Sequence, residues 1–359
     1  MTGFGVFSRP GEGPRVGFRD GDSVLDLSGL GETLREPSLN AFMARGPSAW
    51  AKTRARLEEA PRLPLEEVEL HLPFEVADYV DFYSSLEHAT NLGRLFRPDS
   101  EPLLPNWRRL PVGYHGRAGT VVVSGTPVRR PSGQSKPPGA DEPVFGPSRR
   151  LDIELELGFV IGTPSRLGEP VPVERALEHV FGVVLVNDWS ARDIQAWEYQ
   201  PLGPFLGKSF ATSIGAWVTP LDALEPYRVA GEQQEPEPLE YLRAPPTAYD
   251  IALEVELNGE VISRTNARHL YWSIEQQVAH ATVNGASLRT GDLLATGTIS
   301  GPTPDSRGSL IELSWNGAEP IELADGTTRT FLEDGDEVVL RGAAGKVELG
   351  EVRGRILGR

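Results

Sequence analysis

The stretch from Leu151 to Leu157 alternates apolar and acidic residues and carries the side chains with the clearest chemical potential. A repeat of two is typical of a β-strand, in which successive side chains face opposite sides. Carboxylates two residues apart start only about 6.6–6.8 Å apart on a strand, so they can share one cation. Like charges on one face otherwise repel each other. The pattern predicts either a metal site or a solvated outer face, and the acids on that face are Asp152, Glu154 and Glu156.

A second candidate stretch, residues 81–97, interleaves an acid, a tyrosine, a histidine and two arginines with apolar residues. Ser84 or Ser85 is expected to cap a helix, which places His88 in the first turns of that helix. An imidazole with an unperturbed pKa of about 6.5 is the natural general base near neutral pH. A lone histidine in a helix can also be structural. A catalytic role for His88 is favoured because a potential oxygen ligand for a metal occurs in the same stretch.

A third candidate stretch, residues 110–117, places Tyr114 and His115 between two glycines. This arrangement predicts a tight turn that presents both side chains. The alternative is an ordinary β-turn with an exposed aromatic residue.

Residues 187–212 form a dense polar run bracketed by aromatic residues. Asp188 follows a buried strand predicted over 182–187, at a strand-to-helix corner. Arg192 and Gln195 are three residues apart, so they share one face of the helix that follows. With Lys208, these residues offer a metal ligand and the donors of an oxyanion clamp. The alternative interpretation is an ordinary network of ion pairs.

Glu312 lies between apolar neighbours in a stretch predicted to be a strand. An acid that faces inward needs a partner, for which a histidine is one candidate. All the candidate metal ligands are oxygens, and the chain has no cysteine. These ligands favour Ca²⁺ or Mg²⁺ over zinc.

The surrounding elements indicate a β-rich chain of two domains. We expect a small N-terminal domain over 1–73 and a second domain over 74–359, consistent with 359 residues. In the first, an Asp-Gly-Asp turn joins two short strands, and a helical region covers 38–60. In the second, we expect a strand over 119–124, a long loop over 131–149, helices over 173–180 and after Ser190, a hairpin around Asn258-Gly259 and a helix within 266–284.

Composition narrows the class of protein. The net charge of −16 argues against nucleic acid or an anionic membrane as a partner, because both attract basic surfaces. The chain lacks the basic and apolar regions of a signal peptide, and no apolar run has the length of a membrane span. A cytoplasmic protein is therefore expected.

Four of these motifs together resemble the fumarylacetoacetase family, whose enzymes hydrolyse 4-fumarylacetoacetate at the end of tyrosine and phenylalanine catabolism. The resemblance runs from about Asp78 to the last strands, and it rests on residues 81–91, 110–117, 187–195 and 201–210. It implies a small SH3-like N-terminal barrel followed by a mixed β-sandwich roll, overall α+β and mostly β, and a homodimer.

The resemblance also implies roles for particular residues. His88 would be the base that activates water, supported by Glu312. Ca²⁺ would be held by Asp81, Glu154, Glu156 and Asp188. Mg²⁺ would lie at a second site with Lys208, Thr212 and Asp188. The oxyanion would be stabilised by Arg192, Gln195 and Lys208. The substrate, a β-diketo acid, would contact Tyr83, Arg97, Tyr114, Gln195, Tyr199 and Thr298.

Two other functions are compatible with parts of the pattern. A related acylpyruvate hydrolase or oxaloacetate-type decarboxylase would share the acids. A non-catalytic Ca²⁺-stabilised scaffold would share the metal site, but it would not require His88, Glu312, Arg192 and Lys208 together.

Overall fold

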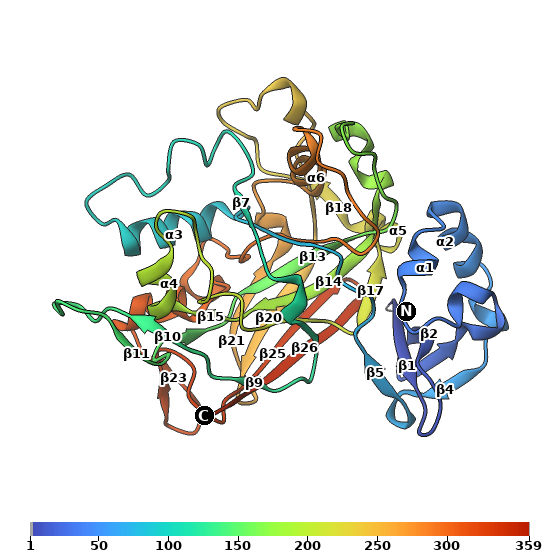
Figure 1. The fold of residues 1–359 in the computed structure, drawn as a ribbon, viewed down its shortest axis with the longest axis horizontal. Helices are drawn as coiled ribbons and strands as arrows, with labels where there is room; N and C mark the ends of the chain where they lie inside the picture. The colour runs from blue at the N-terminus through green and yellow to red at the C-terminus, as the bar shows by residue number, and fades with distance from the viewer. Residues whose placement is uncertain (1–2, 359) are drawn as a thin grey trace.

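The computed structural model describes residues 3–358, which form a mixed α+β, mostly β protein with a small N-terminal domain and a C-terminal mixed-sheet domain. The N-terminal elements, blue in Figure 1, gather at one side of the molecule next to β17. The fold class expected from the sequence is thus confirmed, whereas the division of the chain at residue 73 stays a prediction. Among residues 3–358, no helix is both long and apolar enough to cross a membrane.

The α-helices within residues 3–358 are mostly short. They are α1 (Asn40–Met43), α2 (Pro47–Arg54), α3 (Leu86–Phe96), α4 (Arg192–Glu198), α5 (Leu221–Leu224), α6 (Ile274–Thr282) and α7 (Leu310–Leu313).

A large sheet of 13 strands spans both domains. Its strands are β1 (Phe4–Ser8), β2 (Arg15–Asp20), β3 (Ser23–Asp26), β4 (Arg62–Pro64), β5 (Glu69–His71), β6 (Tyr79–Phe82), β7 (Gly113–His115), β8 (Val121–Val123), β13 (Leu155–Ile161), β14 (Val180–Asp188), β16 (Thr212–Ile214), β17 (Trp217–Pro220) and β22 (Leu293–Ala295). The main path runs β4-β3-β2-β1-β17-β14-β13-β22-β6-β7.

A second sheet of five strands has the order β21-β20-β25-β26-β9. Its strands are β9 (Val128–Arg129), β20 (Ala252–Leu257), β21 (Glu260–Asn266), β25 (Glu337–Ala344) and β26 (Val347–Leu357). The other strands of residues 3–358 form four two-stranded ribbons: β10 (Ser132–Ser135) with β11 (Val144–Pro147), β12 (Leu151–Asp152) with β15 (Ser190–Ala191), β18 (Arg228–Ala230) with β19 (Thr247–Tyr249), and β23 (Ile321–Glu322) with β24 (Thr328–Arg329).

The central strands β13 and β14 are buried along their whole length. Leu157 and Leu185 pack into a core shared with β20, β25 and β26, where the two sheets face each other. Val160 and Val184 pack into the opposite core, which they share with the N-terminal domain. A strand covered on both faces has no solvated side, so the acids of this region are buried.

The N-terminal strands pair as an open series, β4-β3-β2-β1, with β5 also paired to β1. The expected hairpin is present as β2 and β3 around residues 20–23. The expected hairpin of the second domain is also confirmed. It joins β20 to β21 at Asn258 (φ 53°) and Gly259 (φ 87°), a left-handed turn that this residue pair favours.

Several expected elements differ from the structure. Residues 151–157 are two strands, β12 and β13, interrupted at Ile153–Glu154. The region 131–149 is not a plain loop, because β10 and β11 pair within it. Residues 173–178 form a 3-10 helix. Ser190 lies in β15 and donates its hydroxyl to the carbonyl of Asp188 at 2.9 Å, so it does not cap α4, which begins at Arg192.

Candidate active site

Four buried carboxylates meet at one point of the large sheet. One oxygen from each residue lies within 4.8 Å of the others, and the residues are Asp81, Glu154, Glu156 and Asp188. These are the four residues that the family resemblance implied as metal ligands, and they are buried, so a solvated outer face is wrong for Glu154 and Glu156.

The pairing of four strands brings these acids together. In the antiparallel pair β13–β14, Leu155 lies opposite Asn187, which places Glu154 and Glu156 beside the end of β14 that carries Asp188. Asp81 arrives from β6, which pairs in parallel with β22, and β22 in turn pairs with β13. Ligands distant in the sequence thus converge because their strands are neighbours in one sheet.

The pKa values of these acids are shifted in opposite directions. Burial raises the pKa of Glu156 well above its ordinary value, and the neighbouring Asp81 and Glu154 add to the shift. Burial and Asp188 likewise raise the pKa of Asp81. Burial opposes ionisation of Glu154 too, but Lys208, Arg192 and His88 outweigh it and hold the pKa of Glu154 below its ordinary value.

Glu156 provides the test of whether this cluster fits a metal ion. Its side chain is fully buried, and neither carboxylate oxygen has a hydrogen-bond partner among the described residues. Oδ1 of Asp81 also lacks one. Orphaned buried oxygens are costly unless a ligand satisfies them. An all-oxygen set of this kind suits a hard divalent cation, so the cluster can hold a metal ion.

Two cations lie against the acids. Nζ of Lys208 contacts Glu154 and lies 2.7 Å from Oδ2 of Asp188. Nη2 of Arg192 lies 2.8 Å from Oε1 of Glu154. Arg192 also donates through Nη1 to Oε1 of Gln195 at 3.2 Å, which confirms that these two residues share a face of α4. Both cations are almost fully buried, so they partly balance the four acids.

His88 lies on α3 and faces both the cluster and Glu312. The N-cap of α3 is Ser85, as expected, and its hydroxyl accepts from the backbone N–H of His88 at 3.3 Å. Nδ1 of His88 lies 2.7 Å from Oε2 of Glu312, and Nε2 lies 3.9 Å from Oε1 of Glu154. The expected partnership of His88 and Glu312 is therefore present, with the second ring nitrogen directed at the acids.

Glu312 lies on the short helix α7, so the expectation of a strand is wrong. Besides His88, its carboxylate accepts from Nδ2 of Asn91 at 2.9 Å and from Oγ of Ser300 and Ser309 at 2.9 and 2.7 Å. Burial opposes ionisation, but His88 and these donors hold the pKa of Glu312 below its ordinary value. Sequence reasoning missed these partners, although the three-residue spacing of Asn91 from His88 on one helix was a signal.

Asp152 is fully buried, so a solvated role is wrong for it. Its Oδ2 accepts from Nε of Arg192 at 2.7 Å. It does not belong to the group of four carboxylates that meet at one point.

Two tyrosines predicted to contact substrate border the site. Tyr114, on β7, donates its hydroxyl to Oδ2 of Asp188 at 3.2 Å. The ring of Tyr83 lies edge-on to His88 with the ring centres 5.4 Å apart. Burial, with Glu312 and Glu154 nearby, raises the pKa of Tyr83.

The remaining residues predicted to bind metal or substrate lie in different surroundings. Thr212 donates to Oδ1 of Asp188 at 3.0 Å. Arg97 is the C-cap residue of α3, and its guanidinium donates to the carbonyl of Pro102 at 2.7 Å. Thr298 is buried, with no hydrogen-bond partner for its hydroxyl among the described residues. Tyr199 is 39% exposed, and its hydroxyl accepts from Gln200.

A cavity of about 370 Å³ reaches the cluster from the surface. Asp188 and Lys208 line it, and exposed His115 and Arg117 border it. Residues 113–115 form strand β7, which pairs with β6, so the expectation of a tight turn is wrong. Tyr114 and His115 nevertheless both line this cavity.

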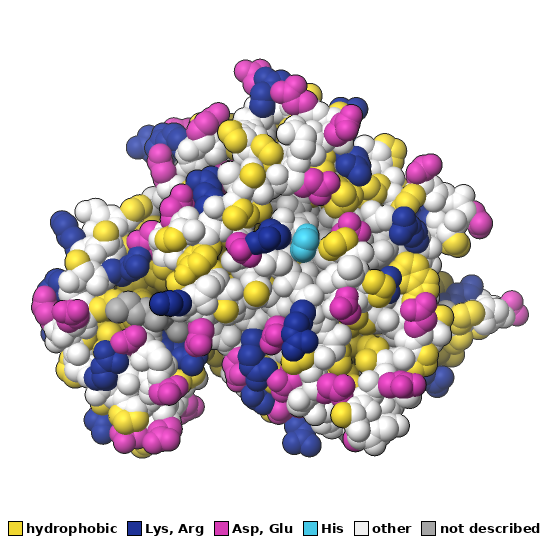
Figure 2. All heavy atoms as spheres, turned by 180° about the vertical axis from the view of Figure 1, so that it is seen from behind, with side chains coloured by type: hydrophobic (Ala, Val, Ile, Leu, Met, Phe, Trp, Pro, Cys, Tyr) yellow, Lys and Arg dark blue, Asp and Glu magenta, His cyan; other side chains and the backbone are white. Residues whose placement is uncertain are grey.

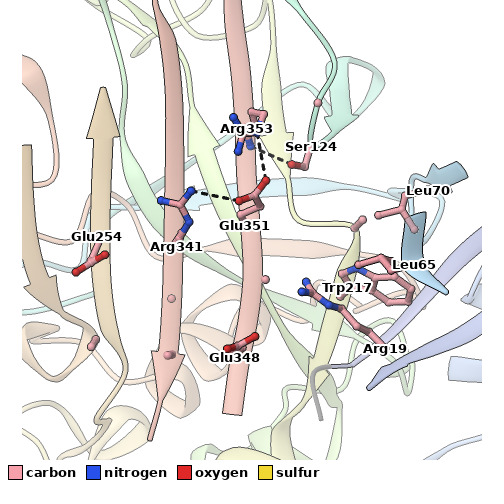
Figure 3. Close-up of a pocket in the computed structure, with 16 residues that line it drawn as sticks. Arg19, Leu65, Leu70, Ser124, Trp217, Glu254, Arg341, Glu348, Glu351 and Arg353 are labelled. Atoms are coloured by element: carbon pink, nitrogen blue, oxygen red, sulfur yellow. Dashed lines mark hydrogen bonds and ion pairs between the residues drawn. The ribbon is translucent and has the colours of Figure 1, made fainter. Parts of the chain in front are cut away.

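A larger cavity, about 830 Å³, lies away from the acids between the N-terminal domain and β25–β26 (Figure 3). There Arg353 pairs with Glu351 at 3.2 Å, and Arg341 lies 3.5 Å from the same carboxylate. These three charged side chains pair with one another. On the molecular face seen in Figure 2, basic and acidic side chains are interspersed.

Comparisons with known proteins identify the family. The model for the fumarylacetoacetase N-terminal region matches residues 3–73, and the model for the fumarylacetoacetate hydrolase C-terminal region matches residues 78–357. Among curated proteins, the chain is 49% identical to fumarylacetoacetase of Rattus norvegicus and 47% identical to that of Homo sapiens. Each alignment covers 99% of this chain and 94% of the relative.

Solved structures support the same fold. A fumarylacetoacetate hydrolase from Exiguobacterium antarcticum superposes with a TM-score of 0.65 at 21% identity, covering all of both chains. Maleylpyruvate hydrolase from Sphingobium sp. SYK-6, in complex with manganese(II) and pyruvate, gives a TM-score of 0.60 at 17% identity over 99% of both chains.

The fold and the site together define a hydrolase built around a buried carboxylate cluster that can hold a metal ion. The chain belongs to the fumarylacetoacetase family.

Proposed function

We propose that this protein hydrolyses the carbon–carbon bond of 4-fumarylacetoacetate to give fumarate and acetoacetate, the last step of tyrosine and phenylalanine catabolism. Identity of 47–49% to curated fumarylacetoacetases over nearly the whole chain supports the substrate. The observation that carries the mechanism is the contact of His88 with Glu312 beside four buried carboxylates.

His88 is the general base in this proposal. Its Nδ1 is held by Glu312 at 2.7 Å, which leaves Nε2 to take a proton from water on the side of the cluster. The Glu312 carboxylate then stabilises the imidazolium. General-base help of this kind is typically worth ~10²–10⁴-fold. Without such a base, water is a poor nucleophile at neutral pH.

The proposed metal is Ca²⁺, as the family resemblance implies, held by Asp81, Glu154, Glu156 and Asp188. The oxygen ligands of these four residues suit a hard cation of this kind. When bound, such an ion acts as a Lewis acid on the diketone oxygens and helps the leaving carbanion depart as an enolate. The unpaired oxygens of Glu156 support this assignment.

Arg192, Gln195 and Lys208 are proposed to stabilise the oxyanion that forms when water adds to the carbonyl. Arg192 and Lys208 are buried cations fixed by ion pairs, so their charge is preorganised. Gln195 gives its amide oxygen to Arg192, which leaves its amide N–H group as the donor.

The remaining assignments rest on the family resemblance. Mg²⁺ is proposed at a second site near Asp188 and Thr212. Lys208 lies beside this site, but its protonated amine cannot bind Mg²⁺, because an ammonium has no lone pair and its charge repels a cation. Substrate contacts are proposed for Tyr83, Arg97, Tyr114, Gln195, Tyr199 and Thr298. A homodimer and a cytoplasmic location complete the proposal.

Turnover of pure fumarylacetoacetate tests this function, with fumarate and acetoacetate measured as products. Intact substrate after incubation with protein and Ca²⁺ would reject it. Comparing kcat/KM across acylpyruvates and oxaloacetate separates the proposal from the related activities. A preference for an acylpyruvate would show that the protein is an acylpyruvate hydrolase instead.

A further inference from the structure

Asp152 connects Arg192 on α4 with helix α7, which carries Glu312. Its fully buried carboxylate faces four N–H donors and accepts from each of them. Oδ1 accepts from the backbone N–H of Ile153 at 2.8 Å and of Leu310 at 2.7 Å. Oδ2 accepts from Nε of Arg192 at 2.7 Å and from the backbone N–H of Ile311 at 3.2 Å.

These contacts position the helix that carries Glu312. Helix α7 has only four residues, and its N-cap residue Ser309 makes no side-chain capping bond. The first N–H groups of a helix need acceptors from outside it. Asp152 supplies them from 158 residues away in the sequence.

The same carboxylate positions Arg192. Nε of Arg192 binds Asp152, whereas Nη2 lies beside Glu154 and Nη1 binds Gln195. Removing the Asp152 contact would leave the guanidinium held only through Glu154 and Gln195. The side chain of Asp152 therefore constrains the separation between the oxyanion clamp and the His88–Glu312 pair.

We propose that Asp152 is a positioning residue that fixes Glu312, and through it His88, relative to Arg192. This inference rests on the proposed roles of those three residues. A carboxylate is required because four donors need two acceptor atoms. An asparagine in either orientation turns an N–H₂ group towards two of those donors.

The test compares Asp152→Asn, which is close to the wild type in volume, with Asp336→Asn as a matched control. Asp336 is 3% exposed, pairs with Arg329 at 3.0 Å and accepts from the backbone N–H of Glu333, away from the site. We expect Asp152→Asn to lower kcat by between about tenfold and about 10²-fold, because small misplacements of reacting groups are costly. KM and the metal affinity measured by calorimetry should change less than about threefold.

A double-mutant cycle with Arg192→Lys separates positioning from general stability. If Asp152 acts through Arg192, the two losses in kcat should not multiply. Losses that multiply fully, or a kcat for Asp152→Asn no lower than that of Asp336→Asn, would overturn the proposal.

An NMR readout in the metal-free protein keeps this test separate from the proposed activity. The proton between Nδ1 of His88 and Glu312 should give a downfield signal, assigned by its loss in Glu312→Gln. Asp152→Asn should shift or broaden this signal, and Asp336→Asn should not. An unmoved signal would reject the positioning role even if the wild type hydrolyses its substrate. Absent wild-type turnover would reject the proposed function alone.

Discussion

Nδ1 of His88 lies 2.7 Å from Oε2 of Glu312, although the two residues are 224 positions apart in the chain. The opposite nitrogen of the same ring faces Glu154, one of the four clustered acids. A ring held through one nitrogen, with the other nitrogen directed at the site, is the arrangement that a general base requires.

His88→Ala should therefore lower kcat by ~10²–10⁴-fold, the usual value of general-base help. Metal affinity should persist, because the four carboxylates stay in place. His280→Ala is the matched control, since His280 is a half-buried histidine that contacts Tyr241. Steady-state kinetics and calorimetry decide the outcome, and a His88→Ala enzyme with near-normal kcat would remove this residue from the base role.

Glu312→Gln should lower kcat by roughly 10²-fold with little change in metal affinity, because the imidazolium loses its counter-charge. The amide also places an N–H₂ group among donors from Asn91, Ser300 and Ser309. Kinetics at saturating substrate measure the effect. Unchanged kcat would show that orientation of His88 does not depend on this carboxylate.

Glu156→Gln should abolish metal binding and yet stabilise the metal-free protein at pH 8 by about 1–3 kcal/mol, because an unsatisfied buried acid is costly. Denaturant unfolding in a chelator measures the stability, and calorimetry measures the binding. Glu275→Gln, a substitution at a buried acid paired with Arg228, should retain metal binding. Metal affinity equal to that of the wild type in Glu156→Gln would contradict the site.

Metal binding should release protons and should tighten as the pH rises, by about tenfold per pH unit for each proton released. Burial and mutual repulsion raise the pKa values of Asp81 and Glu156, so these carboxyls keep protons that a bound cation must displace. Calorimetry in buffers of different ionisation enthalpy measures the release. Identical apparent enthalpies in all buffers would show that no proton leaves.

The raised pKa values of Asp81 and Glu156 also determine whether the stability of the protein rises or falls with pH. Above the ordinary carboxyl pKa of about 4, the folded metal-free protein binds more protons at these two acids than the unfolded chain does. These groups therefore make the metal-free protein less stable as the pH rises towards their raised pKa values. Excess metal should remove this trend, and thermal unfolding at several pH values checks both expectations.

Residue patterns predicted the site better than they predicted its surroundings. Alternation at 151–157 placed Asp152, Glu154 and Glu156 on one face without ranking them, and only the family resemblance singled out Glu154 and Glu156. The alternation also could not show that β13 is covered on both faces. That burial depends on the N-terminal domain and on β20, β25 and β26, which pack there from far along the chain.

Short apolar runs were the weakest part of the prediction. The run at 310–313 has one acid among apolar residues, a pattern that suits a strand or one turn of helix equally. In the structure this run is a helix, and its first backbone N–H groups donate to the carboxylate of Asp152. Ser190 failed as a cap for a similar reason, because β15 pairs with β12 at that position.

Turnover of fumarylacetoacetate with and without chelator tests the central claim most directly. We predict release of fumarate and acetoacetate by the metal-loaded protein, loss of turnover after chelation and recovery on addition of Ca²⁺. Equal turnover with and without chelator would contradict the role given to the four carboxylates, and no turnover under any condition would contradict the proposed function.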